Sequence, residues 1–188
     1  IWADLLERHV HKGRVDYDGF QQDKAVLDSY LDLLDRIDPD QLSQNQKLAF
    51  YINLYNASTI NLILTRYPRI NAIKEIGSFF SNPWSKRVVR LKGRKVSLDH
   101  VEHDILRELF KDPRIHFAIN CASKGCPPLL NRPYEAENLE QTLETRTSLF
   151  INNPKQVFIK NNTLFASRIF RWFSPDFNDN PPGYIRRY

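Results

Sequence analysis

Methionine is absent from this chain of 188 residues, and cysteine occurs only twice. Without methionine the sequence does not start at its own initiator, so we expect that an upstream segment was removed, as cleavage of a secretory signal would do. Two cysteines neither require nor exclude an oxidising compartment. No apolar stretch approaches the ~20 residues that a transmembrane helix needs. We therefore predict no membrane-spanning segment.

A strong charge of one sign is also lacking, since the formal net charge is only +5. The basic residues are dispersed, with one denser patch, KRVVRLKGRK, at residues 86–95. We interpret this patch as the solvated face of a hairpin, although such stretches also attract nucleic acid or anionic lipid. No nucleic-acid-binding motif accompanies it, so we expect no nucleic-acid partner. The sequence gives no sign of oligomeric state.

Apolar content of 41%, with twelve phenylalanines, is enough for one globular domain over residues 1–188. Helical periodicity of apolar residues predicts these helices: one from Trp2 to near Gly13, and others at 23–37, 43–66, 98–110 and 135–151. The helix at 43–66 follows a capping-box sequence that starts at Ser43, and it is apolar nearly all round. We expect it to be the central buried helix.

Short strands flank two turn sequences, Lys92-Gly93 and Asn161-Asn162-Thr163, which predicts two antiparallel hairpins. The last residues, NDNPPGYIRRY, are predicted to be loose. Because helices and hairpins do not alternate as βαβ units, the predicted class is α+β. We expect a single domain with a central buried helix, surrounding helices and short antiparallel hairpins.

The segment RIHFAIN before the first cysteine allows two interpretations. Apolar residues alternate along it, which suits a strand. Asp112-Pro113 suits the N-cap and first position of a helix instead. In a strand, His116 would lie roughly 16 Å from Cys121. Both interpretations make His103 the better base for Cys121, and leave His116 as a positioning residue or a hydrogen-bonded core histidine.

Cys121 lies where a periodic segment gives way to small residues. Backbone N–H groups exposed at such a break lower the pKa of a thiol and stabilise an oxyanion. Three roles are open: a nucleophile, a disulfide with Cys126, or a metal ligand together with Cys126, His100 and His103. The metal alternative is the weakest because no C-x2-C knuckle is present. We predict no metal and no cofactor.

Other polar residues fall where apolar ones are expected. An apolar stripe is expected on the 98–110 helix, formed by Leu98, Val101, Ile105 and Leu109, with Leu106 just beyond it. Glu102 projects into this stripe, so it requires a partner or holds a proton: it either pairs with a core arginine, or is an orienting or proton-handling carboxylate in a cleft. Asn53 and Asn56 lie in the central helix, where buried amides must be hydrogen-bonded. They either pin a loop or orient a catalytic group. Asp176 is a turn residue or a site carboxylate.

Three segments of the sequence resemble those of domain of unknown function 547: AFYINLYNASTINLIL (49–64), SLDHVEHDILRELFKDPRIHFAINCASKGCPPL (97–129) and, more loosely, RWFSPDF (171–177). GRVDY (13–17) adds to the likeness. The family is similar to papain-like cysteine hydrolases and phytochelatin-synthase-like transpeptidases. The resemblance implies a fold that is papain-like or transglutaminase-like in general character, and a bacterial protein that is exported to the periplasm. It also implies a peptide or glutathione-like substrate.

We therefore predict a cysteine-dependent hydrolase or acyl or peptidyl transferase that cleaves amide bonds of such substrates. Cys121 is the predicted nucleophile, His103 the base and then acid, and Glu102 the group that orients or charges His103. The substrate-binding residues are predicted to be Asn56, Arg114, His116 and Ser123. The alternatives are a non-catalytic binding or scaffold domain, and a thiol–disulfide switch of Cys121 and Cys126. Every histidine precedes Cys121, which reverses the papain order.

Overall fold

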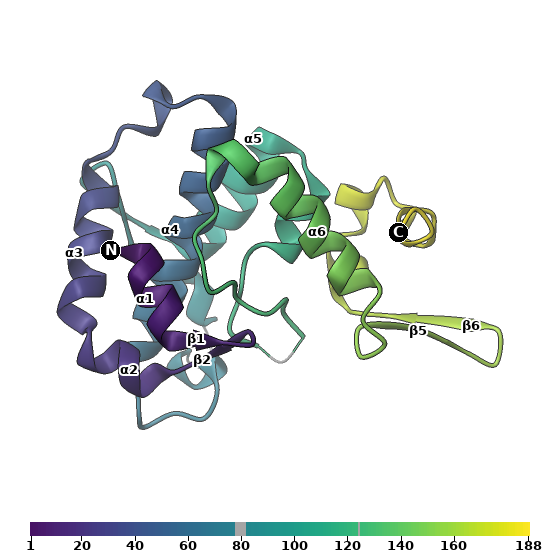
Figure 1. The fold of residues 1–188 in the computed structure, drawn as a ribbon, viewed down its shortest axis with the longest axis horizontal. Helices are drawn as coiled ribbons and strands as arrows, with labels where there is room; N and C mark the ends of the chain where they lie inside the picture. The colour runs from purple at the N-terminus through teal and green to yellow at the C-terminus, as the bar shows by residue number, and fades with distance from the viewer. Residues whose placement is uncertain (78–81, 124) are drawn as a thin grey trace.

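The computed structural model describes residues 1–77, 82–123 and 125–188, and Figure 1 shows their course. The α-helices are α1 (Trp2–His9), α2 (Tyr17–Gln22), α3 (Lys24–Arg36), α4 (Gln44–Leu64), α5 (Glu108–Phe110), α6 (Leu139–Ile151), α7 (Ile169–Trp172) and α8 (Pro181–Ile185). The strands are β1 (Val10–His11), β2 (Arg14–Val15), β3 (Arg87–Leu91), β4 (Arg94–Ser97), β5 (Val157–Lys160) and β6 (Thr163–Ala166). A π-helix, η4 (His100–Arg107), leads into α5. Short 3-10 helices are η1 (Pro39–Gln41), η2 (Ile73–Ile76), η3 (Pro83–Ser85), η5 (Pro113–Phe117), η6 (Ala136–Asn138) and η7 (Ser174–Phe177).

The predicted class is confirmed: the described residues form one mostly helical α+β domain with short hairpins. α4 is its central buried helix, as expected, and α3, α2, β3 and η4 all contact it. The predicted capping box is present, because the Ser43 hydroxyl accepts from the Gln46 N–H while the Gln46 side chain accepts from the Ser43 N–H. Nearly every residue from Leu48 to Leu64 is buried, so this part of α4 has no face exposed to solvent and its sequence is not amphipathic.

Both predicted hairpins form, and each pairs only its own two strands within the part of the chain that is described. Positive φ angles at Lys92 and Gly93 close the β3–β4 turn, and those at Asn161 and Asn162 close the β5–β6 turn. A third hairpin, β1–β2, was not predicted. It turns through Lys12 and Gly13, so the first helix ends at His9 and not near Gly13.

The segment after Asp112 is helical, not extended. The Asp112 side chain accepts from the Arg114 N–H, and Pro113 takes the first position of η5. Ile115, His116 and Phe117 are all buried, so the apolar alternation does not mark one covered face. The helical interpretation is confirmed and the strand interpretation is wrong.

The predicted stripe on the 98–110 helix is also wrong in part. Leu98, Val101 and Leu106 are fully buried, whereas Leu109 is 51% exposed. The reason is the π-helix. Its wider turns rotate each residue about the helix axis by a smaller angle than an α-helix does, and this turns Leu106 toward the core. Ser97 caps this helix by accepting from the His100 N–H.

The end of the chain is ordered, contrary to the prediction that residues 178–188 are loose. The Asn180 side chain caps α8 by accepting from the Gly183 N–H. Tyr184 then packs into a second apolar cluster, distinct from the one around α4. That cluster comprises Phe117, Phe150, Ile151, Ile169, Phe170, Phe177 and Tyr184. Aromatic packing at the far end of α6 therefore holds a tail that has little helical sequence signal of its own.

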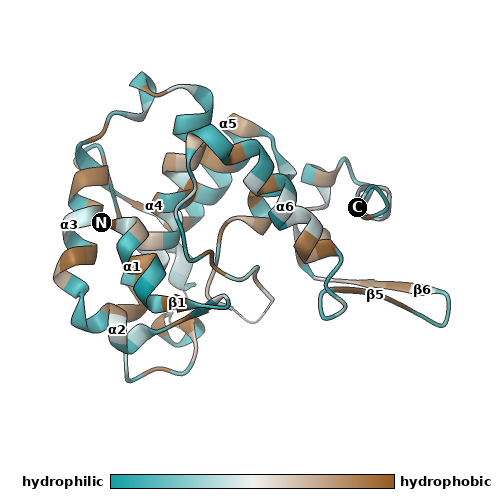
Figure 2. Ribbon diagram, in the orientation of Figure 1, coloured by the Kyte–Doolittle hydropathy of each residue, from teal (hydrophilic) through white to brown (hydrophobic). Residues whose placement is uncertain are grey.

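The hairpin β5–β6 extends away from the rest of the chain (Figure 1). Both of its strands are coloured as hydrophobic along much of their length in Figure 2. No helix in the described residues is long and apolar enough to cross a membrane.

Candidate functional site

Two asparagines of α4 hold distant segments through their side-chain amides. The Asn56 amide donates to the Ala118 carbonyl at 3.1 Å, and its oxygen accepts from the Asn120 N–H at 2.8 Å. Asn53 bonds both backbone groups of Tyr134 in the same way, at 2.8 and 3.0 Å. Each side-chain amide bonds a backbone N–H and a backbone carbonyl of a loop, as a neighbouring strand would do in a sheet. The loop-pinning interpretation is confirmed, and the Asn56 amide, predicted to bind substrate, is engaged by backbone.

Asn56→Ala is expected to lower the free energy of unfolding by about 2 to 3 kcal/mol, because it leaves a buried N–H and a buried carbonyl without partners. The measurement is urea denaturation followed by circular dichroism. Asn61→Ala is the matched control in the same helix, since the Asn61 side-chain oxygen has no hydrogen-bond partner among the described residues. Equal losses for the two variants would contradict the prediction.

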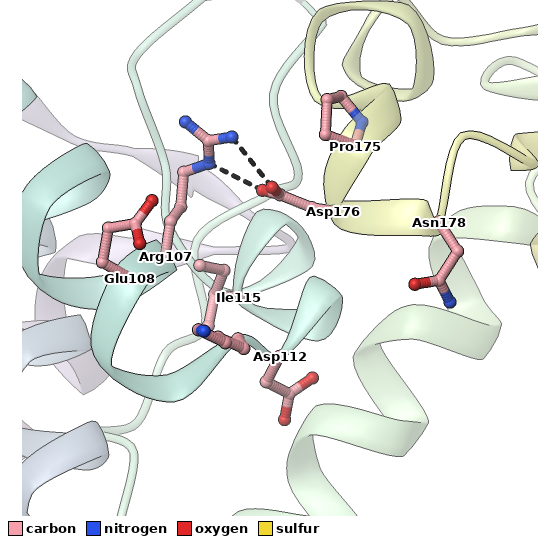
Figure 3. Close-up of a pocket in the computed structure, with 8 residues that line it drawn as sticks. Arg107, Glu108, Asp112, Ile115, Pro175, Asp176 and Asn178 are labelled. Atoms are coloured by element: carbon pink, nitrogen blue, oxygen red, sulfur yellow. Dashed lines mark hydrogen bonds and ion pairs between the residues drawn. The ribbon is translucent and has the colours of Figure 1, made fainter.

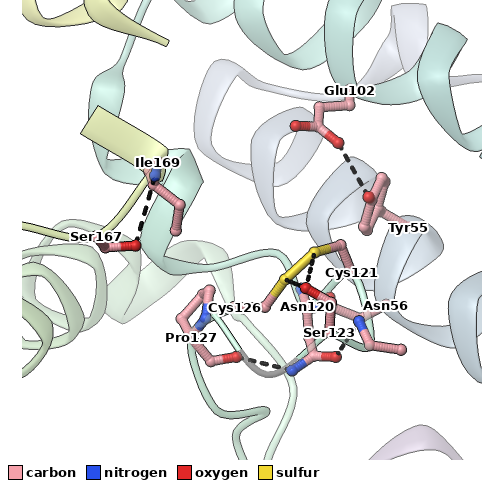
Figure 4. Close-up of a disulfide and its surroundings, with 11 residues drawn as sticks. Tyr55, Asn56, Glu102, Asn120, Cys121, Ser123, Cys126, Pro127, Ser167 and Ile169 are labelled. Carbon is pink, nitrogen blue, oxygen red and sulfur yellow. Dashed lines mark hydrogen bonds between the residues drawn. A yellow bond between two sulfur atoms is a disulfide. The ribbon is translucent and has the colours of Figure 1, made fainter. Parts of the chain in front are cut away.

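Directly after the segment that Asn56 holds, Cys121 and Cys126 form a disulfide, with Cα atoms 6.0 Å apart. Of the three roles left open for Cys121, this is the one that the structure contains. Both cysteines are partly exposed. The Ser123 hydroxyl lies 3.8 Å from the Cys121 sulfur and 3.5 Å from the Cys126 sulfur (Figure 4).

The backbone beside the disulfide is fixed by Asn120. Its side-chain oxygen accepts from the Ala122 N–H at 2.9 Å, and its amide donates to the Pro127 carbonyl at 2.7 Å. Ala122 itself is in the left-handed region, with φ of 55°. A non-glycine residue rarely adopts this conformation. The chain therefore bends directly after the cysteine, and Asn120 stabilises this bend.

Glu102 lies with Tyr55 in the surroundings of the disulfide (Figure 4). The Tyr55 hydroxyl donates to the Glu102 carboxylate at 2.9 Å. Complete burial of Tyr55, together with the negative charge of Glu102, raises the pKa of the phenol well above its usual value. The partner of Glu102 is thus a buried tyrosine of α4, and within the described part of the chain it forms no ion pair with an arginine, one of the two alternatives expected for it.

His103 faces a guanidinium. Nη1 of Arg107 lies 3.2 Å from Nδ1 of His103. Because a guanidinium only donates, Nδ1 is the acceptor, and the proton of the neutral ring lies on Nε2. In the described residues no hydrogen bond joins His103 to Glu102 or to Cys121.

Arg107 leads into a charged network that the sequence did not reveal. Its Nε and Nη2 donate to the two carboxylate oxygens of Asp176 at 2.6 and 2.8 Å. Nε2 of His116 lies 2.7 Å from the same carboxylate, and Phe173 stacks on the His116 ring at 4.0 Å. Burial opposes ionisation of Asp176, but the hydrogen bonds from Arg107 and His116 outweigh it. They hold the pKa of Asp176 well below its usual range.

His116 is therefore a hydrogen-bonded core histidine, one of the two roles predicted for it. Arg114, predicted to bind substrate, instead pairs with both oxygens of Asp112 and with Glu140 of α6 at 2.8 Å. The Asp112 hydrogen bond, opposed by burial and assisted by Glu140, raises the pKa of Arg114. These contacts join η5 to α6, and they engage Nε and Nη2 of the Arg114 guanidinium.

A pocket of about 260 Å³ opens beside the charged network (Figure 3). Its lining comprises Arg107, Glu108, Lys111, Asp112, Ile115, Pro175, Asp176 and Asn178. Neither cysteine contributes to it. The described residues contain no group of three or more histidine, cysteine or acidic side chains arranged to hold a metal ion. His100, one of the predicted alternative ligands, pairs with Asp104 on the surface.

Comparison with known proteins supplies one match. No curated protein matches the sequence. No solved structure matches either. Residues 39–151, more than half of the chain, match the family described as protein of unknown function, DUF547. The match extends from η1 through α4 and the disulfide to the end of α6, and it confirms the family that the sequence resembled. The chain belongs to the DUF547 family.

Proposed function

We propose that this domain is a cysteine-dependent hydrolase or acyl or peptidyl transferase acting on amide bonds of peptides or glutathione-like compounds. Cys121 is the nucleophile, and it is available only after the disulfide with Cys126 is reduced. The observation that supports this most is the placement of Cys121. It is partly exposed and lies between Asn120, which is held to the central helix, and a bend at Ala122, with the Glu102–Tyr55 pair in its surroundings.

In the proposed reaction the Cys121 thiolate attacks the carbonyl carbon of the substrate and forms a thioester as the amine departs. Water or a second amine then releases the acyl group. The oxyanion needs backbone donors near the sulfur. The Ala122 N–H already donates to Asn120, so the neighbouring N–H groups of Cys121 and Ser123 are the proposed donors.

We propose His103 as the group that takes and returns the proton, on condition that its ring first moves away from Arg107. While Arg107 donates to Nδ1, the Nε2 position of the neutral ring already holds a proton. The ring must therefore leave Arg107 before its accepting nitrogen is able to take the proton of Cys121. In the same step we propose that Glu102, the preceding residue, orients the ring. The protonated His103 then supplies the proton of the leaving amine.

The test compares turnover of fluorogenic peptide amides and a γ-glutamyl amide by the native chain, with and without reductant, and by Cys126→Ser. We expect the native chain to be active only with reductant, because the disulfide removes the nucleophile. Cys126→Ser should be active in both conditions. Labelling by iodoacetamide against pH gives an independent measure: a reactive Cys121 is alkylated near neutrality, an ordinary thiol only above about pH 8.5.

A second candidate is a thiol–disulfide switch without amide chemistry, and the disulfide itself favours it. The same experiment separates the two functions. If no form of the chain turns over any of these amides, while a free-thiol count shows reversible reduction, the switch is the better account.

A further inference from the structure

The segment between Glu144 and Asp176 contains no acidic residue at all. Its cations are Arg146, Lys155, Lys160, Arg168 and Arg171. Among the described residues, it also holds six of the eleven large apolar side chains that are exposed: Leu149 (60%), Phe158 (41%), Ile159 (74%), Leu164 (38%), Phe165 (45%) and Trp172 (60%). Exposed apolar groups gathered in this way, with charge of one sign, indicate an interaction surface.

The β5–β6 hairpin is apolar on both faces, which is unusual. Side chains alternate between the faces of a strand. The register therefore places the Phe158–Phe165 pair on one face and the Ile159–Leu164 pair on the other. The two phenylalanine rings stack with centroids 5.0 Å apart, yet both remain more than one third exposed. An antiparallel pair normally turns one face to a core and the other to water.

The hairpin is anchored at one end only. Val157, at its base, packs against the cluster around Phe177. Beyond that point every residue of both strands is exposed, and the hairpin extends from the body of the molecule (Figures 1 and 2). A two-stranded hairpin alone is marginally stable in water. Burial of its apolar side chains would therefore stabilise the hairpin most in an environment that covers both faces together.

We infer that this hairpin, with Trp172, docks on an anionic lipid bilayer. A flat protein surface would cover one face of the hairpin, whereas the interfacial layer of a bilayer surrounds both. Lys155, Lys160 and Arg168 add attraction to negative lipid headgroups, and no nearby acidic residue in the segment opposes them. Phenylalanine and tryptophan are residues that favour the membrane–water interface.

The depth of insertion is limited to the interface. The outer backbone edges of both strands have no partner in the hairpin, and unpaired edges do not enter hydrocarbon. The turn, Asn161-Asn162, is polar as well. The hairpin therefore lies within the headgroup layer, as amphipathic interfacial helices do.

The experiment is co-sedimentation of the full chain with vesicles of phosphatidylcholine alone, or of phosphatidylcholine with phosphatidylglycerol. We expect binding to the anionic vesicles that weakens as salt rises, and little binding to neutral ones. Trp172 emission should shift to shorter wavelength on binding and become protected from acrylamide. Ile159→Ser/Phe165→Ser should weaken binding by about tenfold or more. Lys155→Gln/Lys160→Gln should weaken it by about fivefold per lysine.

Leu33→Ser is the matched control, because Leu33 is a similarly exposed leucine (47%) on α3, outside the hairpin segment. It should bind like the native chain. The inference is overturned if the native chain fails to bind anionic vesicles, or if the hairpin and Leu33 variants bind equally well. A third outcome would also overturn it: no vesicle binding, together with a dimer in sedimentation velocity that the hairpin substitutions dissociate. In that case a second copy of the chain covers the hairpin.

Discussion

Cys121→Ala is expected to reduce turnover of peptide or γ-glutamyl amides by about a thousandfold or more under reducing conditions. The proposed reaction needs a covalent thioester, and alanine offers no nucleophile. The measurement is the initial rate with the native chain and the variant at matched concentration. Mass spectrometry of a quenched reaction should show an acylated native chain and an unmodified variant.

Cys126→Ser provides the control, because both substitutions remove the same disulfide and only one removes the nucleophile. Any loss of stability from opening the small loop is therefore common to both variants. Cys126→Ser should retain most of the activity of the reduced native chain. Native-like turnover by Cys121→Ala, or equal loss in both variants, would rule out Cys121 as the nucleophile.

Asp176→Asn is expected to lower the free energy of unfolding by about 3 kcal/mol near pH 7. The carboxylate accepts from Arg107 and His116, and its removal leaves a partly buried guanidinium without its counter-charge. Urea denaturation measures the effect. Asp104→Asn is the control, since it breaks an exposed ion pair with His100 that should contribute little.

The same residue gives a pH dependence with a definite sign. The folded pKa of Asp176 lies below that of an unfolded aspartate, so its contribution is complete well above about pH 4. As the pH falls below that value, the unfolded chain takes up the proton first, and the native state loses this stabilisation. The difference in stability between the native chain and Asp176→Asn should therefore shrink from pH 6 toward about pH 2. A difference that is constant over this range would contradict the assignment.

Local sequence signals predicted the parts of this fold that depend on neighbours in the chain. The capping box at Ser43 and the turn at Lys92-Gly93 are examples, because each is decided by a few adjacent residues. The π-helix was not predictable, since the same apolar residues suit an ordinary α-helix. It displaced the expected stripe and exposed Leu109.

In the candidate site, too, the features set by adjacent residues were predictable from the sequence, and those set by the tertiary fold were not. That buried asparagines in α4 need partners follows from the sequence, but which loops they hold does not. The bonds from Asn56 span more than sixty residues. Asp176 lies 69 residues from Arg107 and 60 from His116, and only the tertiary fold brings them together. A lone SPDF turn gives no sign of this.

The two asparagine clamps have a consequence for redox chemistry. Asn56 holds the chain just before the cysteines, and Asn53, one turn earlier on α4, holds it again at Tyr134. When the disulfide is reduced, the loop that contains both cysteines therefore stays attached to α4 at its two ends. The liberated sulfurs remain at high effective concentration, on the order of millimolar or above. Ring closure should then outpace capture by a dilute alkylating reagent whenever an oxidant is present.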